Sequence, residues 1–210
     1  MVRDNLGKKK ELNLLYIYSA AWFFFALITG INPKNRLAWF LEAIVMVALI
    51  FILLLTQKKF RFSKLSYTLI FIYISMPLIA AHYSYENVPL DWFNNLFDTG
   101  RNYFDRIVHF SFGLLLAIPI REFFIRTTKI KNLWSYTVPV LILFGASAIY
   151  EIFEWAVMVY LPEKASFVFL AAQGDIWDSQ KDMSLAGIGA VVIMSLTLIF
   201  NKVKLRFNHG

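Results

Sequence analysis

Six apolar runs divide the sequence, and each approaches or exceeds the roughly 18 residues that an α-helix needs to cross a bilayer. Soluble domains contain about half apolar residues. Here 59% of the residues are hydrophobic. The sequence therefore predicts an all-α fold, a polytopic transmembrane helix bundle of about six spans. We expect residues 1–210 to form a single integral membrane domain in the lipid bilayer. The expected spans are about 14–31, 37–55, 65–82, 104–125, 133–161 and 184–200.

Basic residues are distributed unevenly between the two sides that these spans define. Fifteen of the 21 Lys and Arg residues lie before the first span, around two of the loops, and after the sixth span, all on one side. Basic segments are retained in the cytoplasm, so both termini are predicted to be cytoplasmic. The net charge of +7 is then a consequence of topology, and we expect no nucleic-acid partner. The absence of cysteine excludes disulfides and thiolate catalysis.

Acidic residues are concentrated on the opposite, outer side, where eleven of the fourteen lie. Acids contribute little to topology, so this asymmetry needs another cause. Residues 173–183 place three acids directly before the sixth span, on what would be one helical face. The fourth span carries an acid and a histidine one turn apart, and the fifth carries two glutamates. These ionisable residues are Asp105 and His109, Glu151 and Glu154, and Asp175, Asp178 and Asp182.

Small residues continue the same faces into the membrane. They are Gly113 and Ala117 in the fourth span, Gly145 to Ala148 in the fifth, and Ala186, Gly189 and Ala190 in the sixth. Small residues allow close packing of membrane helices. We therefore expect the spans within about 104–200 to converge on one polar site at the outer rim, with those within about 14–82 as scaffold. Glu42, in the second span, is expected to face an interhelical gap, with membership of the site as the alternative.

Six carboxylates and one imidazole cannot lie together fully charged without compensation, since buried charge is costly. A divalent cation is one solution, and this donor set suits Mg²⁺, Mn²⁺ or Ca²⁺, or Zn²⁺ if His109 is the leading ligand. A metal-free network is the other, in which some acids are protonated or pair with arginine or lysine. One of the acids near residue 175 also suits a plain helix cap. The candidate metal ligands are His109, Glu151, Glu154, Asp175, Asp178 and Asp182.

Three motifs in the sequence resemble the YjdF family of bacterial inner-membrane proteins. They are Arg101-x-x-x-Asp105-Arg106-x-x-His109-Phe110-x-Phe112-Gly113, Tyr150-Glu151-x-x-Glu154-Trp155, and Gln173-Gly174-Asp175-x-Trp177-Asp178-x-Gln180-x-Asp182-Met183. The resemblance spans nearly the whole chain. It implies a multi-pass fold in the bacterial cytoplasmic (inner) membrane rather than a particular reaction.

A more distant similarity is to VanZ-like membrane proteins, which also place Asp-x-x-x-His on one span. In those proteins a glutamate follows on the next span, and aspartates lead into a final span rich in small residues. Some of them are linked to glycopeptide resistance, so the similarity implies an envelope-facing role. Glu154 and the Trp-containing last motif depart from the VanZ pattern.

The function that these patterns favour is an envelope-facing membrane enzyme, a hydrolase or transferase acting on a lipid or lipid-linked headgroup. Asp105, His109 and Glu151 are the expected catalytic residues, with Asp105 orienting His109 as an acid or base. Two alternatives remain: a proton- or cation-coupled carrier that uses the same acids as a relay, and a non-catalytic protein in which the network fixes the helices. The expected substrate-binding residues are Arg101, Arg106, Gln173, Trp177 and Gln180, with the two arginines holding an anionic headgroup.

Overall fold

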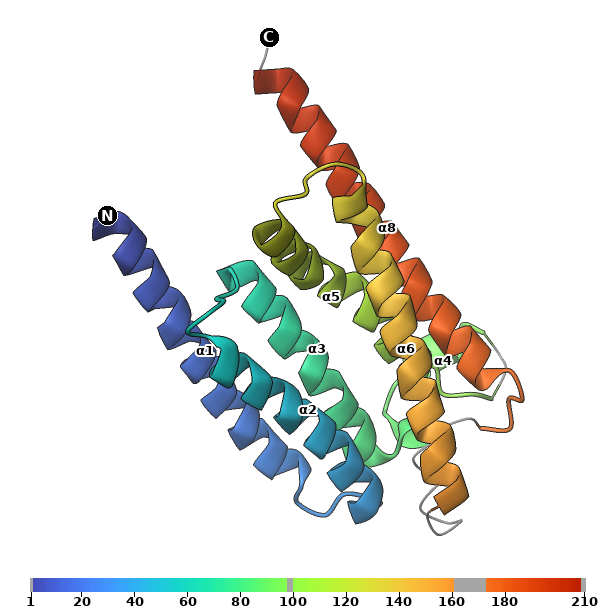
Figure 1. Cartoon of the computed structure of the whole chain (residues 1–210). Coiled ribbons are helices and arrows are strands. Elements are labelled where there is room, and N and C mark those ends of the chain that lie inside the picture. Colours follow the sequence, from blue (N-terminus) through green and yellow to red (C-terminus); the bar gives the residue numbers. More distant parts are fainter. Residues whose placement is uncertain (1, 98–99, 161–172, 209–210) are drawn as a thin grey trace.

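Long antiparallel helices make up the protein. The structure is a computed structural model that describes residues 2–97, 100–160 and 173–208. No strand occurs in these described ranges. Successive long helices run in opposite directions, so both chain termini lie toward the same end of the bundle (Figure 1). The long helices are α1 (Val2–Thr29), α2 (Arg36–Thr56), α3 (Lys64–Tyr83), α5 (Phe104–Thr128), α6 (Trp134–Tyr160) and α8 (Asp178–Asn208).

The predicted spans coincide with these helices. Five of them, α2, α3, α5, α6 and α8, are long and apolar enough to cross a membrane, and α1 contains the shorter apolar stretch Leu14–Thr29. The polytopic helical fold is therefore confirmed, although the predicted end of the fifth span at residue 161 lies outside the described residues. The connection between α3 and α5 contains a 3-10 turn, η1 (Tyr85–Asn87), and the short helix α4 (Asp91–Asn94).

Two groups of helices share the interior. In the first, α1, α2 and α3 bury large side chains such as Trp22, Ile50 and Tyr67 against one another. In the second, α5 packs most extensively against α8, and α6 packs against both. The helix α3 contacts α1, α2 and α5, so it connects the two groups. The helices expected to carry the site thus form one unit, resting on the predicted scaffold.

Glycine allows the close approach of α5 and α8. A Cβ atom added to Gly113 would collide with the Ala186 carbonyl oxygen, and one added to Gly189 would collide with the Phe110 carbonyl oxygen. The small-residue faces of these two helices therefore pack as predicted. The expectation for α6 is wrong at Gly145, because an added Cβ there would meet nothing within 4 Å. Gly145 is exposed, and the partly buried Ala146 and buried Ser147 face inward instead.

Candidate functional site

The turn before α8 is fastened to the start of α5. The Gln173 side chain accepts a hydrogen bond from the Asn102 backbone N–H and donates one to the Asn102 carbonyl, at 2.9 and 3.0 Å. The Asp175 carboxylate accepts from the Trp177 N–H, a local turn that leads into α8 at Asp178. The Lys181 ammonium, 2.6 Å away, and the Trp177 N–H hold the pKa of Asp175 below its usual value. Residues far apart in the sequence are thereby held at one end of the bundle.

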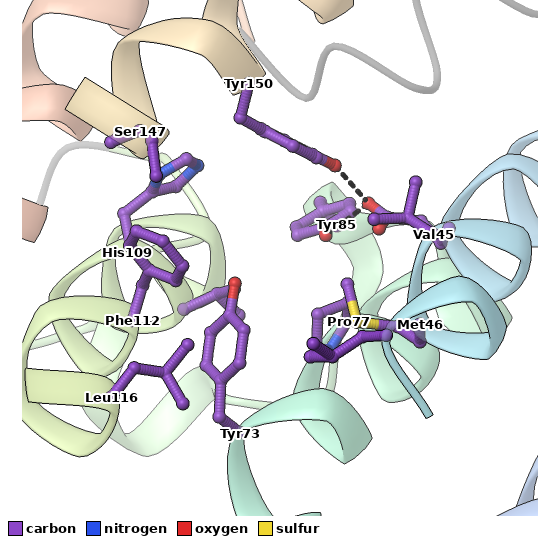
Figure 2. Close-up of a pocket in the computed structure, with 14 residues that line it drawn as sticks. Val45, Met46, Tyr73, Pro77, Tyr85, His109, Phe112, Leu116, Ser147 and Tyr150 are labelled. Atoms are coloured by element: carbon purple, nitrogen blue, oxygen red, sulfur yellow. Dashed lines mark hydrogen bonds between the residues drawn. The ribbon is translucent and has the colours of Figure 1, made fainter. Parts of the chain in front are cut away.

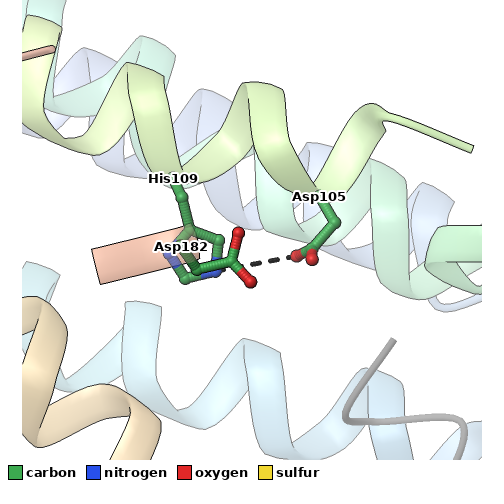
Figure 3. A group of neighbouring side chains, drawn as sticks. All are labelled: Asp105, His109 and Asp182. Carbon is green, nitrogen blue, oxygen red and sulfur yellow. Dashed lines mark ion pairs between the residues drawn. The ribbon is translucent and has the colours of Figure 1, made fainter. Parts of the chain in front are cut away.

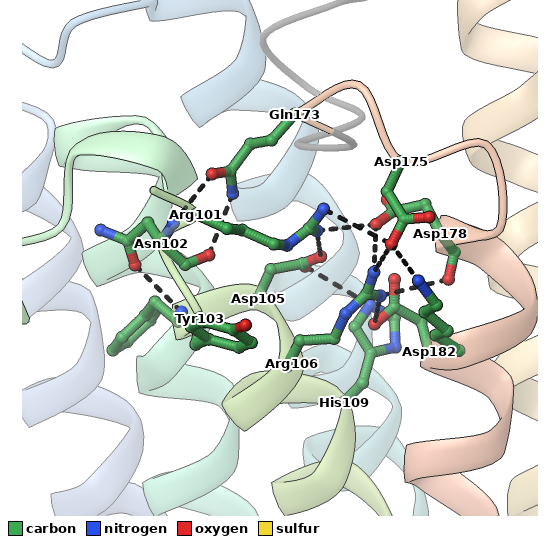
Figure 4. Close-up of polar contacts among 12 residues, drawn as sticks. Arg101, Asn102, Tyr103, Asp105, Arg106, His109, Gln173, Asp175, Asp178 and Asp182 are labelled. Carbon is green, nitrogen blue, oxygen red and sulfur yellow. Dashed lines mark hydrogen bonds and ion pairs between the residues drawn. The ribbon is translucent and has the colours of Figure 1, made fainter. Parts of the chain in front are cut away.

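Two arginines on or beside α5 neutralise the acids of α8 (Figure 4). Both guanidinium groups donate to Asp178 Oδ1, from Arg101 at 2.7 Å and from Arg106 at 2.6 Å. Arg106 also donates to Asp175 Oδ2 at 3.1 Å and forms an ion pair with Asp182. Removing one partner of a buried pair costs about 3–5 kcal/mol, because the other charge is left uncompensated. Pairing with arginine, which belongs to the metal-free network considered from the sequence, therefore involves Asp175, Asp178 and Asp182.

Asp105, His109 and Asp182 form a tighter group beneath these pairs (Figure 3). All three are buried, and each offers a ligand atom that lies within 4.8 Å of the others. His109 Nε2 is 3.6 Å from Asp105 Oδ1, too far for a hydrogen bond. Asp105 Oδ2 is buried and has no hydrogen bond among the residues that the structure describes, although Arg101 lies 3.7 Å away. Two carboxylates and one imidazole thus converge with spare ligand capacity.

The glutamates of α6 approach the same group. Glu151 Oε1 lies 3.8 Å from His109 Nδ1, and this buried oxygen has no hydrogen bond within the described part of the chain. Glu154, one turn farther along, is half-buried and interacts electrostatically with Glu151 and Asp105. We call the assembled residues the polar cluster. It comprises Arg101, Asp105, Arg106, His109, Glu151, Glu154, Asp175, Asp178 and Asp182.

Three residues that were predicted to bind the substrate are exposed outside the polar cluster or form hydrogen bonds with another part of the chain. Trp177 has 59% of its surface exposed, and Gln180 is exposed as well. Gln173 is engaged with Asn102 of the neighbouring turn. The arginines expected to hold an anionic headgroup already bond to Asp178. Their substrate-binding roles stay predictions.

A cavity of about 250 Å³ adjoins the polar cluster, and His109 lines both (Figure 2). Glu42 faces this interhelical space, as expected, but its partners Tyr85 and Tyr150 were missed. Their hydroxyls donate to Glu42 Oε1 at 2.6 and 3.2 Å. Burial and the nearby Glu42 carboxylate raise the pKa of Tyr85 well above its usual value, so this phenol stays a hydrogen-bond donor. The only signal in the sequence was an acid within an apolar run.

Comparison with known proteins establishes the family. A family model described as "Predicted membrane protein (DUF2238)" matches residues 14–203. The chain belongs to the DUF2238 family. One relative of this DUF2238 protein is the inner membrane protein YjdF of Escherichia coli (strain K12). The two are 30% identical over 181 residues, which make up 85% of this chain and 86% of the relative. No solved structure matches.

The comparisons confirm the resemblance to the YjdF family and the multi-pass inner-membrane location. The DUF2238 match contains every residue of the polar cluster, as well as the helices α2, α3, α5 and α6 in full. It assigns no role to any residue, so the catalytic and metal-binding roles within this DUF2238 protein remain predictions. The VanZ-like similarity also stays a prediction.

Proposed function

We propose that the protein is an envelope-facing membrane hydrolase or transferase that acts on a lipid or lipid-linked headgroup. Its reactive centre would be a divalent cation held by Asp105, His109 and Asp182. The observation that carries this proposal is the convergence of their three ligand atoms within 4.8 Å, in a buried position. The placement on the outer side follows from the distribution of basic residues.

The donor set fits a divalent cation. Two carboxylates supply the charge that balances a dication, and one imidazole suits Mn²⁺ or Zn²⁺ better than Ca²⁺. Three protein ligands leave coordination positions for water or substrate, which is typical of catalytic rather than structural sites. Arg106 pairs with Asp182, and Glu151 faces the second nitrogen of His109. Such outer contacts orient metal ligands in proteins.

The surrounding charges favour the same conclusion. The polar cluster contains six carboxylates. The basic side chains beside them are those of Arg101, Arg106 and the adjacent Lys181, so negative groups are in excess. Ion pairs involve Asp175, Asp178 and Asp182, but one oxygen each of Asp105 and Glu151 is buried without a hydrogen bond to any residue that the structure describes. A cation beside Asp105 would supply the missing charge. When bound, it would polarise a phosphoryl or carbonyl oxygen or activate water, and Glu151, whose Oε1 lies 3.8 Å from His109 Nδ1, would be a carboxylate available to accept a proton.

Metal analysis of the purified protein tests the proposal. We expect the wild type to retain a divalent cation and His109→Ala and Asp182→Asn to lose it. Glu122→Gln is the matched control, because Glu122 is a hydrogen-bonded acid at the opposite end of α5 and should leave the metal in place. Incubation with membrane lipids, followed by mass spectrometry, should then show a cleaved or transferred headgroup only with metal-loaded protein. Metal content unchanged in His109→Ala would contradict the proposal.

A structural network is the second candidate, and the shared bonds of both arginines to Asp178 favour it. These bonds join the start of α5 to the start of α8 and fix the register of the two helices. On this alternative, Asp178→Asn lowers the melting temperature while no divalent cation binds to the wild type. The same metal analysis therefore separates the two functions.

A further inference from the structure

The interhelical cavity beside the polar cluster is lined by apolar side chains and by a few polar ones. Helices α2, α3, α5 and α6 and the turn η1 surround it. Aliphatic side chains, among them Met46, Leu49 and Leu116, form much of the lining. Glu42 on α2 and Ser147 on α6 provide polar groups in the lining, and Figure 2 shows Ser147 beside His109. At about 250 Å³, the cavity is slightly smaller than the ~300–1,000 Å³ typical of ligand sites, so it suits a small occupant.

Glu42 lacks a partner of opposite charge. The side chain is 1% exposed, and its Oε1 atom accepts bonds from two neutral tyrosine hydroxyls. Its Oε2 atom is buried with no hydrogen bond, and no basic side chain pairs with Glu42 in the described part of the chain. Ser147 Oγ is also buried without a hydrogen bond. Burying an isolated carboxylate costs free energy, so Glu42 Oε2 is an acceptor available to a ligand that carries an N–H or O–H donor.

Aromatic rings line the cavity around this carboxylate. Tyr73 and Phe112 pack together, with ring centroids 5.3 Å apart, and Tyr85 and Tyr150 extend from other elements to Glu42. The faces of aromatic rings attract ammonium groups, most strongly where water is excluded. A carboxylate with an open acceptor and several aromatic rings is the combination that recognises an organic cation. We propose that this cavity binds a protonated amine with a small apolar body.

The proposed amine site touches the polar cluster at His109 but does not depend on a metal. Glu42, Tyr73 and Tyr85 make none of the contacts that join Arg101, Arg106 and the aspartates of α8. Amine binding would therefore persist in chelator-treated protein and in Asp182→Asn. The metal proposal and the amine proposal can therefore fail independently of each other.

Three ligands of six carbons each, with different polar ends, provide the test. Hexylamine, hexanol and hexanoate are titrated calorimetrically into chelator-treated protein in a sterol-based detergent, whose own body is too large for the cavity. We expect hexylamine to bind about tenfold more tightly than hexanol, because its ammonium group carries the charge opposite to that of the Glu42 carboxylate and the hydroxyl of hexanol carries none. Hexanoate should bind least, because its charge repels Glu42. Equal binding of hexylamine and hexanol would overturn the proposal.

Two pairs of variants locate the binding. Glu42→Gln should remove the preference for hexylamine over hexanol, whereas Glu86→Gln, the same change at an exposed position, should retain it. Ala146→Phe should fill the cavity and abolish binding of both ligands, whereas Ser195→Phe, in a groove on α8, should not. Should Ala146→Phe fail to fold, the Glu42→Gln result decides alone. Unchanged hexylamine affinity in Glu42→Gln would overturn the proposal.

Discussion

Carboxylates at opposite ends of α5 differ in how many of their oxygens accept hydrogen bonds. At one end Glu122 accepts hydrogen bonds from the Ser63 N–H, from the hydroxyls of Ser63 and Ser66, and from Arg126. At the other end, about 25 Å away at 1.5 Å per residue, Asp105 keeps one buried oxygen without any hydrogen bond. A carboxylate whose oxygens are all satisfied caps and joins helices, as Glu122 does for the start of α3.

The difference separates a structural acid from a site that is ready for a ligand. Buried polar groups in proteins are nearly always hydrogen-bonded, and exceptions call for an explanation. In the polar cluster the exceptions include oxygens of Asp105 and Glu151, which both flank His109. In the lining of the cavity the exceptions are Glu42 and Ser147. The two proposals each give one of these exceptions a ligand, a divalent cation in the first case and an amine in the second.

The largest effect on stability is expected from Arg106→Ala. This change leaves Asp178 and Asp182 without their shared guanidinium, so it should destabilise the protein by about 3–5 kcal/mol. Thermal unfolding in detergent measures the loss, with the exposed Arg36→Ala as the control that should have little effect. A loss similar to that of the control would show that the arginine pairs do not hold α5 to α8.

A smaller loss is expected from Glu122→Gln. The amide keeps one acceptor but cannot satisfy Ser63, Ser66 and Arg126 together, and a buried donor left unsatisfied costs about 1–3 kcal/mol. The same thermal measurement should show this loss while metal content stays at the wild-type level. Loss of metal in this variant would mean that the two ends of α5 are not independent.

Asp105→Asn should change the stability in the opposite direction. Asparagine relieves the repulsion from Asp178 and Asp182 and loses only the 3.7 Å ion pair with Arg101, while both arginines stay bonded to Asp178. Stability in the absence of metal should therefore stay the same or rise by up to about 1 kcal/mol. Metal affinity should fall in the same variant. A substantial drop in the melting temperature of chelator-treated protein would instead place Asp105 among the structural acids, with Glu122.

The smallest effect is expected at Lys181, which is half exposed. The lowered pKa of Asp175 means that its ion pairs stabilise the folded state above the ordinary pKa of an aspartate, about 3.9, and lose that contribution as the pH falls through the folded-state pKa. In Lys181→Gln the melting temperature should therefore decrease less as the pH is lowered. Melting curves between neutral and acidic pH check this, and an unchanged pH profile would contradict it.

The sequence was informative where position along a helix determines the outcome. Spans followed from apolar runs, and the i to i+4 spacing of Asp105 and His109 placed both on one face of α5. Convergence with Asp182 followed from small residues, since Gly113 and Gly189 bring α5 against α8. The same reasoning failed at Gly145, because composition does not reveal which face of α6 turns inward.

The hydrogen-bond partners could not be predicted from the sequence. Nothing in the spacing of Asp175, Asp178 and Asp182 shows that both arginines bond to Asp178, or that Asp105 keeps an unused oxygen. The pairing of Glu42 with Tyr85 and Tyr150 joins residues 43 and 108 positions apart. Such contacts depend on the rotation of each helix about its axis, which tertiary packing determines.

Titration of Mn²⁺ into chelator-treated protein, followed by electron paramagnetic resonance, tests the central claim most directly. The account predicts saturable binding of Mn²⁺ with a nitrogen coupling from the His109 imidazole, lost in His109→Ala and retained in Glu122→Gln. Absence of bound Mn²⁺, or bound Mn²⁺ whose nitrogen coupling survives in His109→Ala, would contradict it.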